Sequence, residues 1–171
     1  MERRLALVTG ASAGIGAAFA RIFADNGYDV MLTARRADRL EALAEEIRLR
    51  HGVVALTFAA DLAEPEAPVR ILDQFAVHGR NVDALVNNAG YGLPGAYAET
   101  VWAEQAAFIQ VMVTAPCELA HRVLPGMQAR GFGRIINVAS LAGLIPGAAG
   151  HTLYAASKAF LVKASQSLHL E

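Results

Sequence analysis

Short apolar runs alternate along the chain with longer segments in which apolar residues recur at helical spacing. The runs have the length of strands, and the longer segments are typical of amphipathic helices. The pattern predicts strands at residues 5–9, 29–33, 53–58, 82–87 and 134–138. It predicts helices at residues 15–26, 37–51, 65–78, 102–130 and from 154 onward, with a small-residue loop at 141–152 and with Pro116 and Pro125 kinking or interrupting the fourth helix.

Strand and helix alternate in the way that builds parallel β-α-β units with helices on both faces. The strands are continuously apolar rather than alternating, which is typical of a sheet covered on both sides. We therefore expect an α/β, doubly wound parallel sheet of about five strands, in a single domain spanning residues 1–171. Ligands of such sheets bind beyond the carboxyl ends of the strands, so the residues that follow each strand are the candidate site.

Charge and cysteine content exclude several classes of function. The formal net charge is -1 and no basic stripe is visible, so we expect neither nucleic acid nor an anionic membrane as a partner. The single cysteine, Cys117, excludes an internal disulfide and a cysteine-ligated metal site, and we expect no metal. A lone cysteine in an apolar segment is predicted to be a buried core residue.

The N-terminus carries two arginines before its first apolar run, as a secretory signal would. That run ends at Thr9-Gly10, which is too early for the apolar core of a signal peptide. No apolar stretch is long and unbroken enough to span a bilayer. We therefore expect a soluble, cytoplasmic protein.

A glycine-rich segment, T-G-A-S-A-G-I-G, directly follows the first predicted strand. The first glycine allows a tight turn, the second lets backbone approach a pyrophosphate, and the third lets the helix pack against the sheet. The start of that helix offers free N–H groups and a positive dipole end to phosphates. The predicted cofactor-binding residues of this segment are Gly10, Ser12, Gly14, Ile15 and Gly16.

The same segment also matches G-x-S-x-G, the nucleophile turn of α/β-hydrolases, through Ser12. A hydrolase would need an acid and then a histidine downstream, for which Asp83 and His151 are the candidates. A nucleophile turn on the first strand is out of place, and Ser12 is better explained as a phosphate or turn ligand.

Further motifs follow in order along the chain. Asn87-Asn88-Ala89-Gly90 comes after the fourth strand, Ser140 closes the fifth, and Tyr154 and Lys158 form a Y-x-x-x-K pair. Together with T-G-x-x-x-G-x-G, these motifs resemble the short-chain dehydrogenase/reductase family over essentially the whole chain. The resemblance implies a Rossmann fold, a nicotinamide dinucleotide cofactor, and an oxidoreductase that interconverts a carbonyl and an alcohol by hydride transfer.

Tyr154 and Lys158 lie four residues apart at the start of a predicted helix, so their side chains share one face. A nearby ammonium favours the phenolate, and Tyr154 could then act as general acid in reduction and general base in oxidation. Ser140 would donate a hydrogen bond to the substrate oxygen. By resemblance, Lys158 would also hold the nicotinamide ribose. The predicted catalytic residues are Ser140, Tyr154 and Lys158, and the last two also count as cofactor-binding.

The second strand runs into Ala34-Arg35-Arg36, with no carboxylate to accept hydrogen bonds from the 2′-hydroxyl of NAD. Ala34 stands where NAD-specific members of the family carry Asp, and Arg35 can pair with a 2′-phosphate. We predict NADP. NAD stays possible, because Ala13 is not the basic residue that many NADP-using members carry in the glycine loop, and both arginines could simply be solvated.

Two other predicted strand ends contribute candidate cofactor contacts. Asp61 and Leu62, after the third strand, resemble the family's adenine contact, although Asp61 could instead shape a turn or helix entry. Asn88, Ala89 and Gly90, after the fourth strand, are expected to line the adenine-ribose side of the cofactor.

The chain departs from the family in two ways. Met112 stands where the family usually has an asparagine that supports a proton-relaying water, and a thioether cannot donate as an amide does. Members of the family also continue with two more strands and a substrate-covering loop, whereas this sequence stops at Glu171. The alternative prediction is therefore a truncated dinucleotide-binding module with little or no turnover.

The substrate itself is not specified by the sequence. Residues 91–98 and 141–153 are expected to line its pocket, and their small, apolar character suggests an apolar or modest-sized carbonyl or alcohol. By resemblance we expect a homo-oligomer, a dimer or tetramer, formed through the helices at 102–128 and 154–170.

Overall fold

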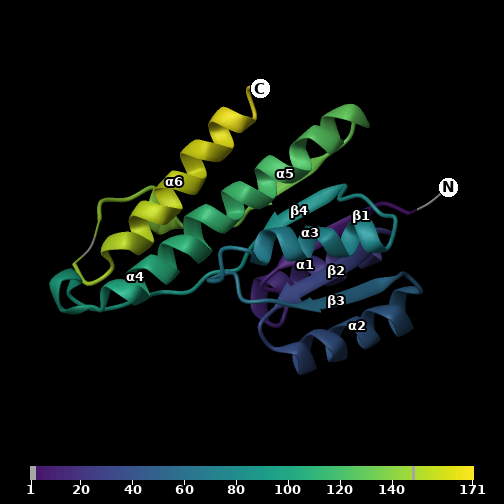
Figure 1. Ribbon diagram of the computed structural model, residues 1–171, viewed down its shortest axis with the longest axis horizontal. Coiled ribbons are helices and arrows are strands. Elements are labelled where there is room, and N and C mark those ends of the chain that lie inside the picture. The colour runs from purple at the N-terminus through teal and green to yellow at the C-terminus, as the bar shows by residue number, and fades with distance from the viewer. Residues whose placement is uncertain (1–2, 148) are drawn as a thin grey trace.

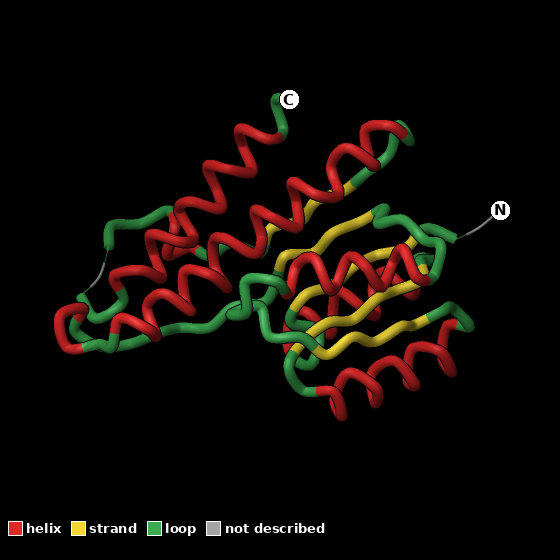
Figure 2. Tube along the Cα trace, in the orientation of Figure 1, coloured by secondary structure: helices red, strands yellow, loops and turns green. Residues whose placement is uncertain are grey.

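The protein, described by a computed structural model over residues 3–147 and 149–171, contains a parallel sheet with strands in the order β3-β2-β1-β4-β5 (Figures 1 and 2). The predicted α/β, doubly wound sheet is confirmed. The strands are β1 (Leu5–Thr9), β2 (Asp29–Ala34), β3 (Ala55–Ala59), β4 (Ala84–Asn87) and β5 (Arg134–Asn137). The helices are α1 (Gly14–Asp25), α2 (Ala37–His51), α3 (Ala67–Val77), α4 (Trp102–Ile109), α5 (Ala115–Ala129) and α6 (Thr152–Leu168).

Helices cover both faces of the sheet, and each face has its own apolar core. Alternate strand residues such as Ala6 and Val8 pack with α1 and α2, while Leu7 and Leu85 pack with α3 and α5. Figure 1 shows α3 and α1 on opposite faces. β1, β2 and β4 are buried along nearly their whole length, because neighbours flank them and helices cover them. This explains their continuous apolar sequence.

The predicted helix at 102–130 is two α-helices joined by a π-helical turn, η2 (Gln110–Thr114). Pro116 stands in the first turn of α5, where its missing N–H costs little. Pro125, which we expected to kink or interrupt the helix, lies inside α5, and the helix continues to Ala129. Figure 1 shows α6 running beside the α4–α5 segment, at one side of the sheet.

Two features at the periphery of the fold are the edge strand β5 and the cysteine of α5. β5 pairs only with β4 in the described chain and is half-exposed, as expected for an edge strand. Cys117 is exposed, so the prediction of a buried cysteine is wrong. The buried side of α5 carries Pro116, Leu119 and Val123, and Cys117 falls outside that stripe. No helix among the described residues is both long and apolar enough to cross a membrane.

Candidate functional site

A cavity of about 530 Å³ opens beyond the carboxyl ends of the strands, where the topology places ligand sites. Its wall combines the glycine loop after β1 with residues that follow the other four strands, and with α6. Predicted site residues that line it are Gly10, Ser12, Gly14, Ile15, Arg35, Asp61, Leu62, Asn88, Ala89, Gly90, Tyr154 and Lys158. Two predicted residues, Gly16 and Ser140, lie outside the lining.

The glycine loop is held by close backbone packing. Gly10 has a φ of 65°, and a Cβ there would lie 2.8 Å from the Cα of Ala89. A Cβ on Gly16 would overlap the carbonyl oxygen of Gly10 and lie 2.5 Å from the Nδ2 of Asn88. Gly14 has a φ of 57° and faces open space. The absence of a side chain at Gly16 therefore lets α1 pack against the loop, and its absence at Gly14 leaves room on the cavity side.

Thr9 joins the glycine loop to the segment after β4, a role that our list of candidate residues missed. Its buried hydroxyl donates to the carbonyl of Val86 (3.1 Å) and accepts from the backbone N–H groups of Asn88 (2.9 Å) and Ala89 (3.0 Å). The side-chain amide of Asn88 donates to the carbonyl of Thr9 (2.9 Å). One hydroxyl thus fixes the two loops that meet at the centre of the cavity.

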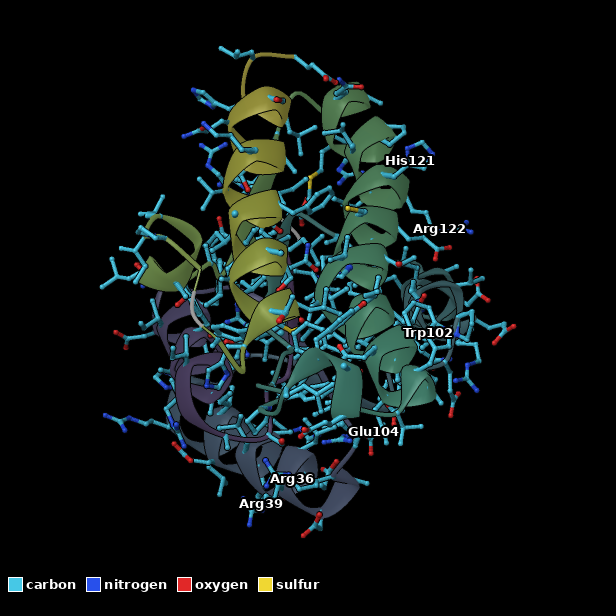
Figure 3. All side chains as sticks on the ribbon, turned by 90° about the vertical axis from the view of Figure 1, so that its left-hand side faces the viewer. Arg36, Arg39, Trp102, Glu104, His121 and Arg122 are labelled. Atoms are coloured by element: carbon cyan, nitrogen blue, oxygen red, sulfur yellow. The ribbon has the colours of Figure 1, made fainter. Side chains whose placement is uncertain are left out.

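The cationic end of the cavity is formed by Arg35 and Arg36, after β2. Arg36 reaches across to the glycine loop, where its Nη2 donates to the hydroxyl oxygen of Ser12 over 2.8 Å. Figure 3 places Arg36 and Arg39 together at the start of α2. The sequence showed two adjacent arginines but only the fold selects the one that meets Ser12. The hydroxyl of Thr33, which also lines the cavity, is buried and has no hydrogen-bond partner among the described residues.

Asp61 and Leu62 line the cavity after β3, and Asp61 also shapes a turn. Its Oδ1 accepts from the backbone N–H of Ala63 over 3.0 Å. The turn interpretation that we left open for Asp61 therefore holds alongside its position in the cavity wall. Leu62 is buried and packs in the core beneath this end of the site.

Tyr154 and Lys158 enter the cavity from the first turns of α6, and the ammonium of Lys158 lies 5.9 Å from the centre of the Tyr154 ring. Lys158 is only 6% exposed, and its Nζ donates to the carbonyl oxygen of Val138 over 2.7 Å. Burial lowers the pKa of the Lys158 amine, because removal from water penalises the charged form. The helix thus holds a phenol and a buried amine on one side, facing the glycine loop.

Ser140 ends the segment after β5, where it caps a short 3₁₀ helix, η3 (Leu141–Gly143). Its hydroxyl oxygen accepts from the backbone N–H of Ala142 over 3.2 Å, which leaves the hydroxyl proton free for another acceptor. η3 packs on α6, since a Cβ on Gly143 would lie 2.6 Å from the carbonyl carbon of Lys158. Ser140 is therefore held beside α6 although it does not line the cavity.

Met112 lies in the π-helical turn and closes the cavity wall next to Gly90. It is 1% exposed, and a Cβ on Gly90 would lie 2.8 Å from its sulfur. The wall between the segment after β4 and α6 is therefore apolar at the position where the family resemblance implies an amide.

The hydrolase alternative does not fit the geometry. Asp83 immediately precedes β4 and accepts a hydrogen bond from the backbone N–H of Leu5 (2.9 Å), at the amino ends of the strands. Ser12 follows the carboxyl end of β1. A strand length therefore separates the candidate acid from the candidate nucleophile.

Three structural observations indicate that a dinucleotide fits this cavity. The glycine loop leaves room at Gly14 for a close backbone approach. The N-terminal end of α1 points into the same space, where its free N–H groups suit a phosphate. Arginine side chains line one end and the phenol of Tyr154 the other.

Comparison with known proteins agrees with this geometry. The chain is 37% identical over 169 residues to the NADP-dependent 3-hydroxy acid dehydrogenase YdfG of Salmonella typhi, covering 98% of this chain and 66% of that protein. A short-chain dehydrogenase from Sphingobium yanoikuyae, solved in complex with NADPH, superposes with a TM-score of 0.90 at 36% identity, covering 98% of this chain and 64% of that one.

The bulky-bulky ketone specific alcohol dehydrogenase from Comamonas testosteroni superposes with a TM-score of 0.91 at 33% identity, over 99% of this chain and 68% of that one. The chain thus spans about two thirds of the length of the relatives it matches. Residues 4–171 match the family described as short chain dehydrogenase, and the chain belongs to that family.

Proposed function

We propose that this chain carries the cofactor site and the catalytic residues of an NADP-dependent oxidoreductase that interconverts a carbonyl and an alcohol. The observation that carries the proposal is the single cavity shared by the glycine loop, two arginines, Tyr154 and Lys158. Relatives named as NADP-dependent enzymes and a structure solved with NADPH support the choice of cofactor.

The adenosine end of the cofactor would lie at the cationic end of the cavity. Arg35 and Arg36 would pair with the 2′-phosphate there, and Ser12 would hold Arg36 in place. Neither of the two residues directly after β2 is a carboxylate, which would repel that phosphate. The N–H groups at the start of α1 would hold the pyrophosphate, and Asp61 and Leu62 would contact the adenine.

The bound cofactor would supply or accept the hydride at the substrate carbon. The chain's own residues would transfer the proton. Tyr154 would donate its phenolic proton to the carbonyl oxygen in reduction and would accept the hydroxyl proton of the alcohol in oxidation. The amine of Lys158, held by the Val138 carbonyl, would hold the ribose hydroxyls. Ser140 would donate its free hydroxyl proton to the same substrate oxygen.

A second candidate is a dinucleotide-binding module with little or no turnover. It is favoured by Met112, which places a thioether in the cavity wall beside Gly90. The presence of Ser140, Tyr154 and Lys158 on one side of the site opposes it.

The first experiment is a calorimetric titration of the 171-residue chain with NADPH and with NADH. We expect NADPH to bind more tightly, and Arg36→Ala to weaken NADPH binding about 10-fold or more without changing NADH binding, because a charge-assisted contact is lost. Arg39→Ala, which removes a neighbouring exposed arginine, is the matched control. Equal binding of both cofactors would contradict the choice of NADP.

Turnover of a ketone panel with NADPH separates the enzyme from the module. Tyr154→Phe should reduce turnover by about 10²- to 10⁴-fold while NADPH still binds, because only the transferred proton is lost. An inactive parent that binds NADPH would favour the module.

We further propose that the chain forms a homo-oligomer through the outer sides of α4, α5 and α6. Trp102 on α4 is 66% exposed, and His121 and Arg122 project from α5 on the same side of the view, farther along the helical segment (Figure 3). A light-scattering mass equal to one chain would contradict this proposal.

A further inference from the structure

A line of polar side chains runs from β4 through β5 to α6, away from the cavity. Asn87 and Asn137 are register partners at the ends of β4 and β5, and the Nδ2 of Asn87 donates to the Oδ1 of Asn137 over 2.9 Å. The Nδ2 of Asn137 donates to the hydroxyl oxygen of Ser165 on α6, also over 2.9 Å. The Ser165 hydroxyl donates to the carbonyl of Leu161.

Asn87, the first residue of this line, determines which group donates in each of its hydrogen bonds. The Nδ2 of Asn87 also donates to the carbonyl of Pro116 (3.2 Å), a group that can only accept. The amide nitrogen of Asn87 must therefore face Pro116, so Asn137 presents its oxygen to Asn87 and its nitrogen to Ser165. In this orientation the Oδ1 of Asn87 is buried and finds no hydrogen-bond partner in the part of the chain that the structure describes. The line is thus an ordered connection, with one arrangement of donors.

Asn137, the last residue of β5, and Val138, which follows it, make hydrogen bonds with α6. Asn137 donates to Ser165, and the carbonyl of Val138 accepts from Lys158. The N–H of Val138 donates to the carbonyl of Asn87 over 2.9 Å, which anchors the same point to β4. Lys158 and Ser165 are seven residues apart, so the two attachment points on α6 are about 10 Å apart along its axis. Two such points fix both the position and the tilt of the helix, which one contact would not.

We propose that Ser165 is a positioning residue, which holds α6 on β5 through Asn137 so that Lys158 and Tyr154 face the cofactor cavity. This inference rests on the proposed function in one respect, that Lys158 contacts the cofactor. Ser165 itself lies outside the cavity and touches no reacting atom. Its effect passes through the placement of α6, which packs on β5, a half-exposed edge strand.

The sequence offers an internal reference for testing this placement, because Lys158 and Lys163 are its only lysines. Lys158 is buried and Lys163 is exposed on the same helix. Acylation of both amines by acetic anhydride, followed by mass spectrometry over a range of pH, gives the apparent pKa of each amine within one molecule. NADPH binding is measured by calorimetry on the same proteins.

In Ser165→Ala, we expect the apparent pKa of Lys158 to rise towards that of Lys163, because the loosened helix exposes the amine to water. We expect the dissociation constant for NADPH to rise about fivefold, the usual worth of one hydrogen bond. Ser165→Thr, which retains the hydroxyl, should restore both values. Ser167→Ala, an exposed serine on the same helix, is the matched control and should change neither.

An unchanged Lys158 pKa in Ser165→Ala, or an equal change in Ser167→Ala, would overturn the proposal. A merely structural role would lower the melting temperature without moving the Lys158 pKa. If the parent binds no NADPH, the proposed function fails, yet the acylation profile still decides the role of Ser165. If Ser165→Ala does not fold, Ser165→Cys weakens the same hydrogen bond at nearly constant size and makes the same comparison.

Discussion

The carboxyl ends of β1 and β5 hold their parts of the site by different means. β1 is flanked by strands on both sides and buried throughout. Its loop is fixed by close packing at Gly10 and Gly16 and by the buried hydroxyl of Thr9, which accepts hydrogen bonds from the segment after β4. β5 is a half-exposed edge strand, and α6 is joined to its end by hydrogen bonds from Lys158 and Asn137. The proposed cofactor-binding side is thus held by close packing and by a buried hydroxyl, whereas the proposed catalytic side is held by a few part-buried hydrogen bonds at an edge strand.

This difference predicts how each side responds to mutation. Backbone packing cannot adjust, so changes near β1 should be costly to the whole fold. Side-chain contacts can be weakened singly, so changes near β5 should alter the site while the fold persists. Four variants, one of which is also measured across a range of pH, test this contrast from the largest expected effect to the smallest.

Gly16→Ala should destabilise the protein by about 3 kcal/mol or more, since overpacking against atoms that cannot move is severe. The new Cβ would overlap the carbonyl oxygen of Gly10 and crowd Asn88. Urea unfolding followed by circular dichroism measures the change. Gly14→Ala, at a φ of 57° but in open space, is the control and should cost only about 1 kcal/mol. An equal cost at both positions would contradict close packing as the cause.

Thr9→Val should cost about 2–3 kcal/mol. Valine keeps the shape of threonine but leaves the backbone N–H groups of Asn88 and Ala89 without the hydroxyl acceptor they have now. Chemical denaturation gives the free energy, and hydrogen exchange at Asn88 and Ala89 should accelerate. Thr9→Ser, which retains the hydroxyl, is the control. Unchanged exchange at these two amides would show that Thr9 does not hold the loop.

Lys158→Met should leave the free energy of unfolding at neutral pH unchanged or raise it by about 1 kcal/mol, because a buried charge is replaced by an apolar chain of similar length. NADPH binding should nevertheless weaken. A loss of more than about 2 kcal/mol would instead show that the contact with Val138 stabilises the fold outright.

The same variant tests a pH dependence. Burial lowers the pKa of Lys158 in the folded chain, so the unfolded chain binds this proton more tightly. The stability of the parent should therefore rise with pH between the lowered pKa of the folded chain and the ordinary lysine value of the unfolded chain. The difference between parent and Lys158→Met, measured across this window by urea unfolding, should show the rise; a flat difference would refute it.

Gly90→Ala should cost less than about 1 kcal/mol, although the new Cβ would lie 2.8 Å from an existing atom. That atom is the sulfur of Met112, at the far end of a flexible side chain that can move. Thermal unfolding compared with Gly16→Ala measures the contrast directly. A cost as large as that of Gly16→Ala would show that Met112 is as fixed as the backbone.

The sequence by itself determined the type and order of the elements, because apolar runs of strand length and helical periods are local properties. It also determined that the sheet is parallel. It placed the candidate residues after the strands, and the carboxyl ends of parallel strands lie at the same edge of a sheet. It did not determine that Cys117 is exposed, because the side of α5 that faces solvent depends on how the helix packs against its neighbours.

Only the tertiary structure decided which of two adjacent arginines meets Ser12, that Thr9 bridges two loops, and that Asn137 links β5 to α6. These contacts join residues that lie from 24 to 79 positions apart in the chain. Their partners come together only when the strands take their register and the helices their tilt. A local pattern indicates which chemical groups are available at a position, whereas the hydrogen-bond partner of each group depends on distances that exist only in the folded chain.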